Sequence, residues 1–242
     1  MISEKIIVAL DISDDKKLDE VLEAFKGKDV IFKVGLQLFN AKGPDIIDRL
    51  KENGNRVFLD LKLFDIPNTI TEAAKEMAKR SVDFFTVHLL NGRRSLTFLK
   101  DGLEEFCGKE KLDVPEIVGV TVLTSFNEEE FHLISGGTSI KKMVEILAVL
   151  GYQAGIRSFV SSPREISLIK GILPDVKLIT PGIRPKENLD IKDDQKRVLT
   201  PGEAIELGAD YLVIGRPIIK SDDMLGAYEK IVKEIEERKE KK

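Results

Sequence analysis

The chain alternates short apolar runs, rich in β-branched residues, with longer stretches of helical periodicity. The apolar runs predict eight strands, at residues 5–10, 30–34, 56–62, 83–88, 116–123, 158–161, 177–180 and 211–214. Amphipathic patterns predict helices at residues 14–25, 44–52, 69–80, 94–107, 140–150, 163–171, 202–207 and 224–239. Eight strands that are each followed by a helix are typical of an α/β protein with a (β/α)8 TIM barrel.

One barrel accounts for the whole length. A single α/β barrel commonly fills about 250 residues, and the chain has 242. No linker rich in Pro, Gly or Ser and no shift in composition divides residues 1–242. We therefore expect a single domain. The alternative, an open doubly wound sheet, lacks support because no G-x-G-x-x-G sequence follows the first strand.

The first three strands carry charge at their C-terminal ends, each on one side only. Successive side chains of a strand point to opposite faces. The first strand therefore has one wholly apolar face and a second face that ends in Asp11. The second strand does the same with Lys33, and the third with Asp60 and Lys62. Active sites of this fold lie where the strands end. The placement of these charges on one face of each strand therefore predicts a charged pocket in the barrel mouth. For the third strand alone, an edge strand with a solvated ion pair is the alternative.

The last two predicted strands run into loops that contain glycine and arginine. The seventh leads to Pro181-Gly182-Ile183-Arg184, and the eighth to Gly215-Arg216. Loops at these places frequently bind phosphate through backbone N–H groups, and arginine adds bidentate contacts to phosphate oxygens. The polar stretch 187–196, which includes Gln195, is either a lid over the ligand or a plain surface loop.

Histidine and cysteine add little chemistry. His88 lies two residues after Thr86 on the fourth predicted strand, so the two side chains share the face expected to point inward. A lone histidine there is more often a hydrogen-bonded core residue than a catalyst. The two histidines, His88 and His132, are too few and too separated for a metal motif. Cys107 is the only cysteine, which excludes an intramolecular disulfide and a cysteine-rich metal site.

The charge balance argues against several classes of partner. The 38 basic and 42 acidic residues are mixed along the chain and leave a net charge of −4, so we expect no nucleic-acid or membrane partner. No apolar run approaches the ~20 residues of a membrane span. The first residues lead straight into a strand without a signal-peptide pattern. We expect a cytoplasmic protein that binds a small molecule.

With these residues in view, the chain resembles the orotidine 5′-monophosphate decarboxylase family over nearly its whole length. The most specific element is Asp60-x-Lys62-x-x-Asp65, followed by Ile66-Pro67-Asn68-Thr69. Other matching segments are Ala9-Leu10-Asp11, Phe32-Lys33-Val34-Gly35, Val122-Leu123-Thr124-Ser125, Pro181-Gly182-Ile183-Arg184 and residues 209–217. One departure is visible: Asn91 precedes a single Gly92, where the family usually has two glycines after the histidine of the fourth strand.

The resemblance implies decarboxylation of orotidine 5′-monophosphate (OMP) to UMP and CO2 in pyrimidine biosynthesis, with no metal and no cofactor. It implies that Lys62 stabilises negative charge at C6 and then protonates that carbon, and that Lys33, Asp60 and Asp65 complete an alternating charge array. The implied substrate contacts are Asp11, Lys33 and Thr69 to the ribose, Thr124 to the pyrimidine, and Arg184, Gln195, Gly215 and Arg216 to the phosphate.

The resemblance also implies a homodimer with shared active sites. In the family the second aspartate of the motif, here Asp65, reaches the site of the neighbouring subunit. Thr69 is expected to come from the partner as well.

Two other functions remain as alternatives. Related barrels, the keto-sugar-phosphate decarboxylases and hexulose-phosphate synthases, share the Asp-x-Lys-x-x-Asp core but depend on magnesium and lack the Ile-Pro-Asn-Thr continuation. A non-catalytic barrel that only binds a nucleotide or sugar phosphate is expected to lack one of the charged residues, and all of them are present here.

Overall fold

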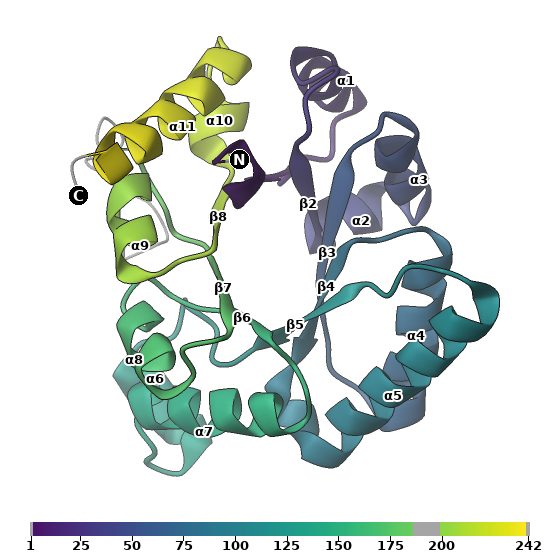
Figure 1. The fold of residues 1–242 in the computed structure, drawn as a ribbon, viewed down its shortest axis with the longest axis vertical. Coiled ribbons are helices and arrows are strands. Elements are labelled where there is room, and N and C mark those ends of the chain that lie inside the picture. The colour runs from purple at the N-terminus through teal and green to yellow at the C-terminus, as the bar shows by residue number, and fades with distance from the viewer. Residues whose placement is uncertain (1, 186–198, 241–242) are drawn as a thin grey trace.

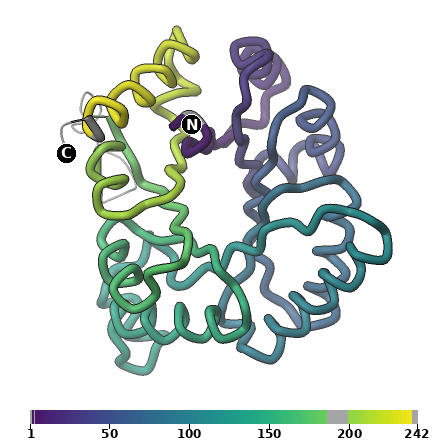
Figure 2. Tube along the Cα trace, viewed as in Figure 1, coloured from purple at the N-terminus to yellow at the C-terminus, as the bar shows by residue number. Residues whose placement is uncertain are grey.

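The computed structural model describes residues 2–185 and 199–240. Its strands form a closed barrel in sequence order, with every neighbouring pair parallel and the eighth strand paired to the first. Figure 1 shows the strands as an inner ring with the helices around it. The chain runs once around this ring, so the two ends of the colour range lie side by side in Figure 2. The (β/α)8 barrel predicted from the alternating pattern is confirmed.

The strands agree closely with the predicted ones. They are β1 (Ile6–Ala9), β2 (Ile31–Gly35), β3 (Arg56–Leu63), β4 (Phe84–His88), β5 (Glu116–Val120), β6 (Ser158–Val160), β7 (Lys177–Thr180) and β8 (Tyr211–Ile214). The largest difference is in β5, which was predicted to extend to residue 123 and ends at Val120. Its partner β6 is only three residues long, and their pairing stops where Val120 meets Val160.

Eight helices of the structure were also predicted. They are α1 (Asp15–Ala24), α3 (Asp45–Glu52), α4 (Pro67–Lys79), α5 (Gly92–Glu110), α7 (Ile140–Gln153), α8 (Ile166–Ile172), α9 (Pro201–Leu207) and α11 (Met224–Glu240). Local signals mark several of their starts. Pro67 begins α4, and Thr200 forms a capping box with Glu203 at the start of α9.

Five short elements were not predicted. They are the helices α2 (Leu36–Lys42), α6 (Glu128–Ser135) and α10 (Arg216–Ile219), and the 3-10 turns η1 (Ser3–Lys5) and η2 (Leu89–Asn91). In α2 only Leu38 is buried, and in α6 only Phe131. A helix that buries one residue leaves no apolar stripe in the sequence, so periodicity cannot reveal it.

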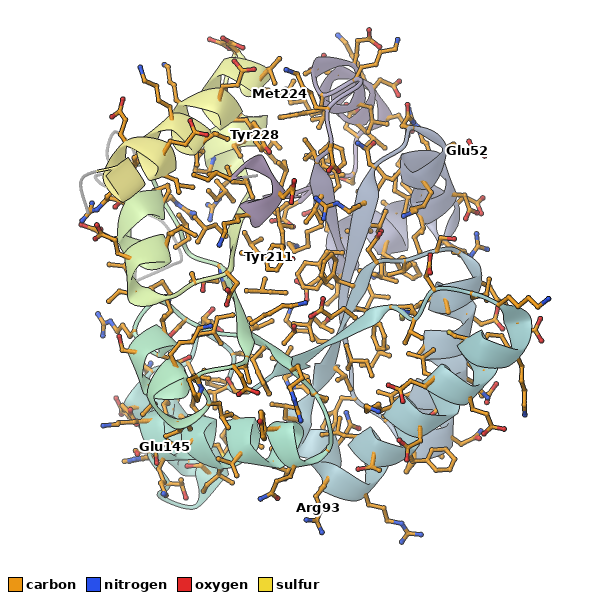
Figure 3. All side chains as sticks on the ribbon, viewed as in Figure 1. Glu52, Arg93, Glu145, Tyr211, Met224 and Tyr228 are labelled. Atoms are coloured by element: carbon orange, nitrogen blue, oxygen red, sulfur yellow. The ribbon has the colours of Figure 1, made fainter. Side chains whose placement is uncertain are left out.

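The strand side chains divide between the two faces as the alternation predicted. One buried cluster fills the inside of the barrel and contains Ile7, Ala9, Ile31, Phe58, Phe84, Val118, Ile179 and Val213. A larger cluster lies between the strands and the helices and includes Ile6, Val8, Phe32, Val34, Val57 and Leu59. Tyr211 packs against the inner cluster and lies within the ring of strands, whereas Glu52, Arg93 and Glu145 lie on the outer rim (Figure 3).

Candidate active site

A cavity of about 250 Å³ lies at the C-terminal ends of the strands. Eight of the predicted site residues line it: Asp11, Lys33, Asp60, Lys62, Thr124, Arg184, Gly215 and Arg216. They meet there because parallel strands all end on the same face of a barrel. The apolar inner cluster supplies the floor, where Ala9, Phe58 and Val213 also line the cavity.

Four of these residues form a chain of alternating charges along β1, β2 and β3. The Lys33 Nζ atom lies 3.2 Å from Asp11 Oδ1 and 3.6 Å from Asp60 Oδ2. The other oxygen of Asp60, Oδ1, lies 2.8 Å from Lys62 Nζ. The Lys33 and Asp60 side chains are only 11% and 14% exposed, so each buried charge contacts opposite charge, as burial of ions requires.

Asp60 is held ionised by its neighbours. Burial is the largest single influence and works to raise the pKa of its carboxyl, whereas the ammonium groups of Lys33 and Lys62 lower this pKa. Hydrogen bonds from Lys62 and from the Thr86 hydroxyl act in the same direction. The pKa of Asp60 therefore lies below its usual value of 3.8, and a fixed negative charge stands between two ammonium groups.

Lys62 reaches the cavity through an irregular stretch of backbone. Leu59 pairs with Phe85 and Leu63 with Val87, so β3 has two more residues than β4 between these pairs. Lys62 itself has a φ of +53°, a left-handed conformation that costs a non-glycine residue about 1–3 kcal/mol. The sequence prediction placed Lys62 on the correct face of β3. It assumed a regular strand, however, and the backbone at Lys62 is irregular.

Thr86 supports both Asp60 and Lys62, a role that was not predicted. This fully buried residue of β4 accepts a hydrogen bond from the Lys62 backbone N–H at 2.8 Å. Its hydroxyl donates to Asp60 Oδ1 at 3.1 Å. The only signal in the sequence was that Thr86 occupies an inward-facing position on the strand next to β3.

Gly35 also makes room for the charge array. A Cβ atom at residue 35 would lie 2.9 Å from Lys33 Nζ and 3.5 Å from Asp11 Oδ1. A side chain there would displace the Lys33 ammonium from its place between the two carboxylates. Glycine at this strand end is therefore part of the site.

Arg184 lines the cavity after β7, and Gly215 and Arg216 line it after β8, the strand that pairs with β1. Arg184 is buried and donates from Nη1 to the Ile183 carbonyl oxygen at 2.9 Å. A Cβ at Gly215 would lie 3.3 Å from the Ala9 Cβ, so glycine allows this loop to pass close to β1. Gln195 and the stretch 187–196 lie outside the described residues.

Asp65 and Thr69 do not line this cavity. Both are exposed, in the segment that leads from β3 into α4. The Asp65 carboxylate accepts the Ile66 N–H at 2.7 Å, and the Asp65 N–H donates to Asn91 Oδ1 at 3.2 Å. The charge array of a single subunit therefore ends at Lys62.

His88 lies beside the array but outside the cavity lining. Burial lowers its pKa from the usual 6.5, the Lys62 ammonium lowers it further, and Asp60 opposes the shift. Within the described part of the chain its buried Nδ1 has no hydrogen-bond partner. The expectation of a hydrogen-bonded core histidine is therefore wrong for this nitrogen: His88 is only partly buried and packs against the Phe64 ring.

The described residues show neither a membrane span nor a cluster of metal ligands. None of the helices within residues 2–185 and 199–240 has the length and apolar character that a membrane span requires. Over the same ranges, no three His, Cys, Asp or Glu side chains are grouped so that they could hold a metal ion.

Comparison with known proteins identifies the family. The model of the "Orotidine 5′-phosphate decarboxylase / HUMPS family" matches residues 4–231. The orotidine 5′-phosphate decarboxylase of Carboxydothermus hydrogenoformans is 44% identical over 238 residues, 97% of each chain. That of Syntrophotalea carbinolica is 40% identical over 233 residues, 96% of this chain and 95% of the relative.

A solved structure shows the same similarity. The crystal structure of orotidine 5′-phosphate decarboxylase from Lactobacillus acidophilus superimposes with a TM-score of 0.82 and 34% sequence identity. It covers 96% of this chain and 99% of that one. The chain belongs to the orotidine 5′-phosphate decarboxylase / HUMPS family.

Proposed function

We propose that the protein is an orotidine 5′-phosphate decarboxylase that converts OMP to UMP and CO2 without a metal or cofactor. The observation that carries the proposal is the Asp11–Lys33–Asp60–Lys62 array, which ends in an ammonium group at the cavity. The relatives bearing this name match almost the full length of the chain. A carboxy-lyase of this kind needs a fixed positive charge where the carbanion forms.

Lys62 would act in two steps at C6 of the pyrimidine. As the bond from C6 to the carboxylate breaks, its electron pair stays on C6 and CO2 leaves as a neutral molecule. The Lys62 ammonium, held by Asp60 at 2.8 Å, faces the developing negative charge without reorganisation. It then gives a proton to C6, and the neutral amine regains one from solvent.

Proton donation alone does not account for the acceleration that enzymes achieve. General acid catalysis typically contributes about 10²–10⁴-fold, or roughly 3–5 kcal/mol. Enzymes typically lower barriers by about 8–23 kcal/mol. The fixed charges and the binding energy of the distant phosphate must supply the rest.

The substrate would span the cavity. We place the ribose hydroxyls against Asp11 and Lys33 of the array, and the pyrimidine edge against Thr124. The phosphate would bind to Arg184, to Arg216 and to the Gly215 N–H, with Gln195 added from outside the described residues. This orientation brings C6 over Lys62 while the phosphate lies after β7 and β8.

A second copy of the chain would complete the site. Asp65 and Thr69 are exposed and outside the cavity of their own subunit, which fits a role in the neighbouring one. Nearby in sequence, Phe64, Ile66 and Leu90 are 62%, 66% and 54% exposed, and large exposed apolar groups commonly mark contact surfaces. We therefore propose a homodimer with shared active sites.

Mixing two inactive variants tests the shared site. Lys62→Ala and Asp65→Ala are each expected to be inactive alone, because each removes one charge from every site. After subunit exchange, a mixed dimer has one site with both Lys62 and Asp65 intact, so activity should return. If each aspartate served its own barrel, every site would keep one defect and mixing would restore nothing.

We also propose that residues 1–242 form one domain that works in the cytoplasm. The family match at residues 4–231 supports the single domain. A phosphorylated nucleotide substrate supports the compartment, because such compounds are made and used there.

The magnesium-dependent members of the wider family are the main alternative, and chelation separates them from this proposal. We expect loss of the orotate-ring absorbance of OMP to proceed at the same rate with EDTA as without it. The reason is that Lys62 supplies the positive charge that a metal would otherwise provide. Turnover that requires added magnesium, or activity on a keto-sugar phosphate in place of OMP, would reject the proposal. A non-catalytic barrel would bind UMP but leave OMP unchanged.

A further inference from the structure

We propose that Asn91 is a positioning residue that fixes the loop carrying Asp65. Its Nδ2 group donates to the Leu63 carbonyl oxygen at 3.0 Å and to the His88 carbonyl oxygen at 2.8 Å. Its Oδ1 accepts the Asp65 N–H at 3.2 Å. One amide therefore joins the end of β3, the end of β4 and the first turn of the loop between β3 and α4.

The side chain at residue 91, and not its backbone, explains this arrangement. Asn91 has a φ of −57° and a ψ of −18°, a helical conformation open to any residue. Gly92 has a φ of +80°, the conformation that favours glycine. A glycine at position 91 would fit the backbone equally well but would make none of the three hydrogen bonds. The departure from the two-glycine pattern thus adds a contact without straining the loop.

The loop needs such support because its other residues are exposed. Phe64, Asp65 and Ile66 all lie at the surface of the subunit, where packing within that subunit does little to restrict the backbone. This inference rests on the proposed function, in which Asp65 acts in the neighbouring site. Holding the loop before the partner's substrate binds removes an entropic cost from the reaction. Asn91 itself does not line the cavity and would touch no substrate.

Two variants separate the hydrogen bonds from the shape of the side chain. Asn91→Asp keeps the shape and one acceptor oxygen but loses both N–H donors and sets a negative charge against two carbonyl oxygens. Asn91→Ala removes all three hydrogen bonds. We expect kcat to fall about 10-fold to 100-fold in both, which corresponds to two or three hydrogen bonds of ordinary net strength. The affinity for UMP should stay unchanged, because the proposed phosphate contacts lie after β7 and β8.

The matched control is Asn53→Ala. Asn53 is the C-cap residue that follows α3, is exposed, and donates from Nδ2 to the Arg49 carbonyl oxygen at 2.8 Å. This substitution removes the same kind of hydrogen bond far from the β3–α4 loop, and kcat should stay at the wild-type value.

A double-variant cycle links Asn91 to Asp65, with enzyme in excess over OMP so that slow variants can be measured. In an Asp65→Ala background, Asn91→Ala should cause no further loss, because the group that it positions is gone. Equal losses in both backgrounds, a wild-type kcat in Asn91→Ala, or a parallel loss of UMP affinity would each overturn the inference.

Hydrogen exchange tests the same inference without an activity assay. Amides of residues 64–66 and of Asn68 should exchange faster in Asn91→Ala than in the wild-type protein, and at the wild-type rate in Asn53→Ala. If the wild-type protein fails to convert OMP, the proposed function is wrong, but faster exchange would still show that Asn91 holds the loop. Unchanged exchange would show that it does not.

Discussion

Lys62→Ala is expected to lose at least about 10⁴-fold in kcat, the upper range of what a positioned proton donor alone supplies. The variant loses the proton donor and also the positive charge that faces the developing carbanion. Asp60 would remain ionised beside Lys33 and Thr86, so the altered site would present a net negative charge to the carboxylate of OMP. Steady-state turnover of OMP, with detection of slow rates at high enzyme concentration, measures the loss.

The loss should not come from unfolding. Alanine at residue 62 meets the same positive φ that lysine already tolerates, and the Lys62 side chain is 31% exposed. Lys42→Ala is the matched control: its Nζ pairs with Asp15 at 2.6 Å and its side chain is 23% exposed, but on the outer helices. We expect that control to keep its activity and both variants to keep the far-UV circular dichroism of the wild type. A Lys62→Ala variant that retains the wild-type rate would refute the assignment.

Asp60→Asn is expected to cause the second-largest effect, on both turnover and stability. The amide leaves the Lys62 ammonium without the charge that contacts it at 2.8 Å, and leaves Lys33 with Asp11 alone. Breaking a buried ion pair by removing one partner costs about 3 kcal/mol of folding free energy at neutral pH, the lower end of the usual range. Turnover should fall by several orders of magnitude because the amide no longer orients Lys62 by charge.

The pH dependence identifies the cause of the lost stability. Because the folded-state pKa of Asp60 lies below the usual 3.8, its stabilising contribution is complete above the unfolded-state pKa and is lost as pH falls through the lower folded value. The stability gap between wild type and Asp60→Asn in urea unfolding should therefore be widest near neutral pH and should shrink below about pH 3.9. Asp15→Asn, at the exposed end of the Lys42 pair, should change stability little at any pH. A gap that stays constant into acid would show that the charge of Asp60 is not its source.

The parts of the site that could be predicted from the sequence are those that follow from the alternation of side chains between the two faces of a strand. Asp11, Lys33 and Asp60 continue the inward set of β1, β2 and β3, and the structure gathers them in one cavity. Lys62 also lies on the face predicted for it, but the irregular pairing of β3 with β4 around it was not predicted. Two extra residues in one strand change neither its composition nor its apolar pattern, so no local signal marks them.

Contacts between strands and loops could not be predicted from the sequence, for a different reason. Thr86 and Asn91 act through hydrogen bonds to backbone groups 24 to 28 residues away in the chain. Such contacts depend on which strands become neighbours and in what register, and the residue types at positions 86 and 91 do not reveal these neighbours. The exposure of Asp65 likewise follows from where α4 begins, and the resemblance to the family supplied its expected role.

The most direct test of this account is to follow OMP in D2O with EDTA present and to analyse the product by NMR. The exchangeable protons of the Lys62 ammonium would then be deuterons. We expect complete conversion to UMP that carries one deuterium at C6, with release of CO2, and no detectable conversion by Lys62→Ala over the same time. Unchanged OMP, or the same labelled product formed at the wild-type rate by Lys62→Ala, would contradict it.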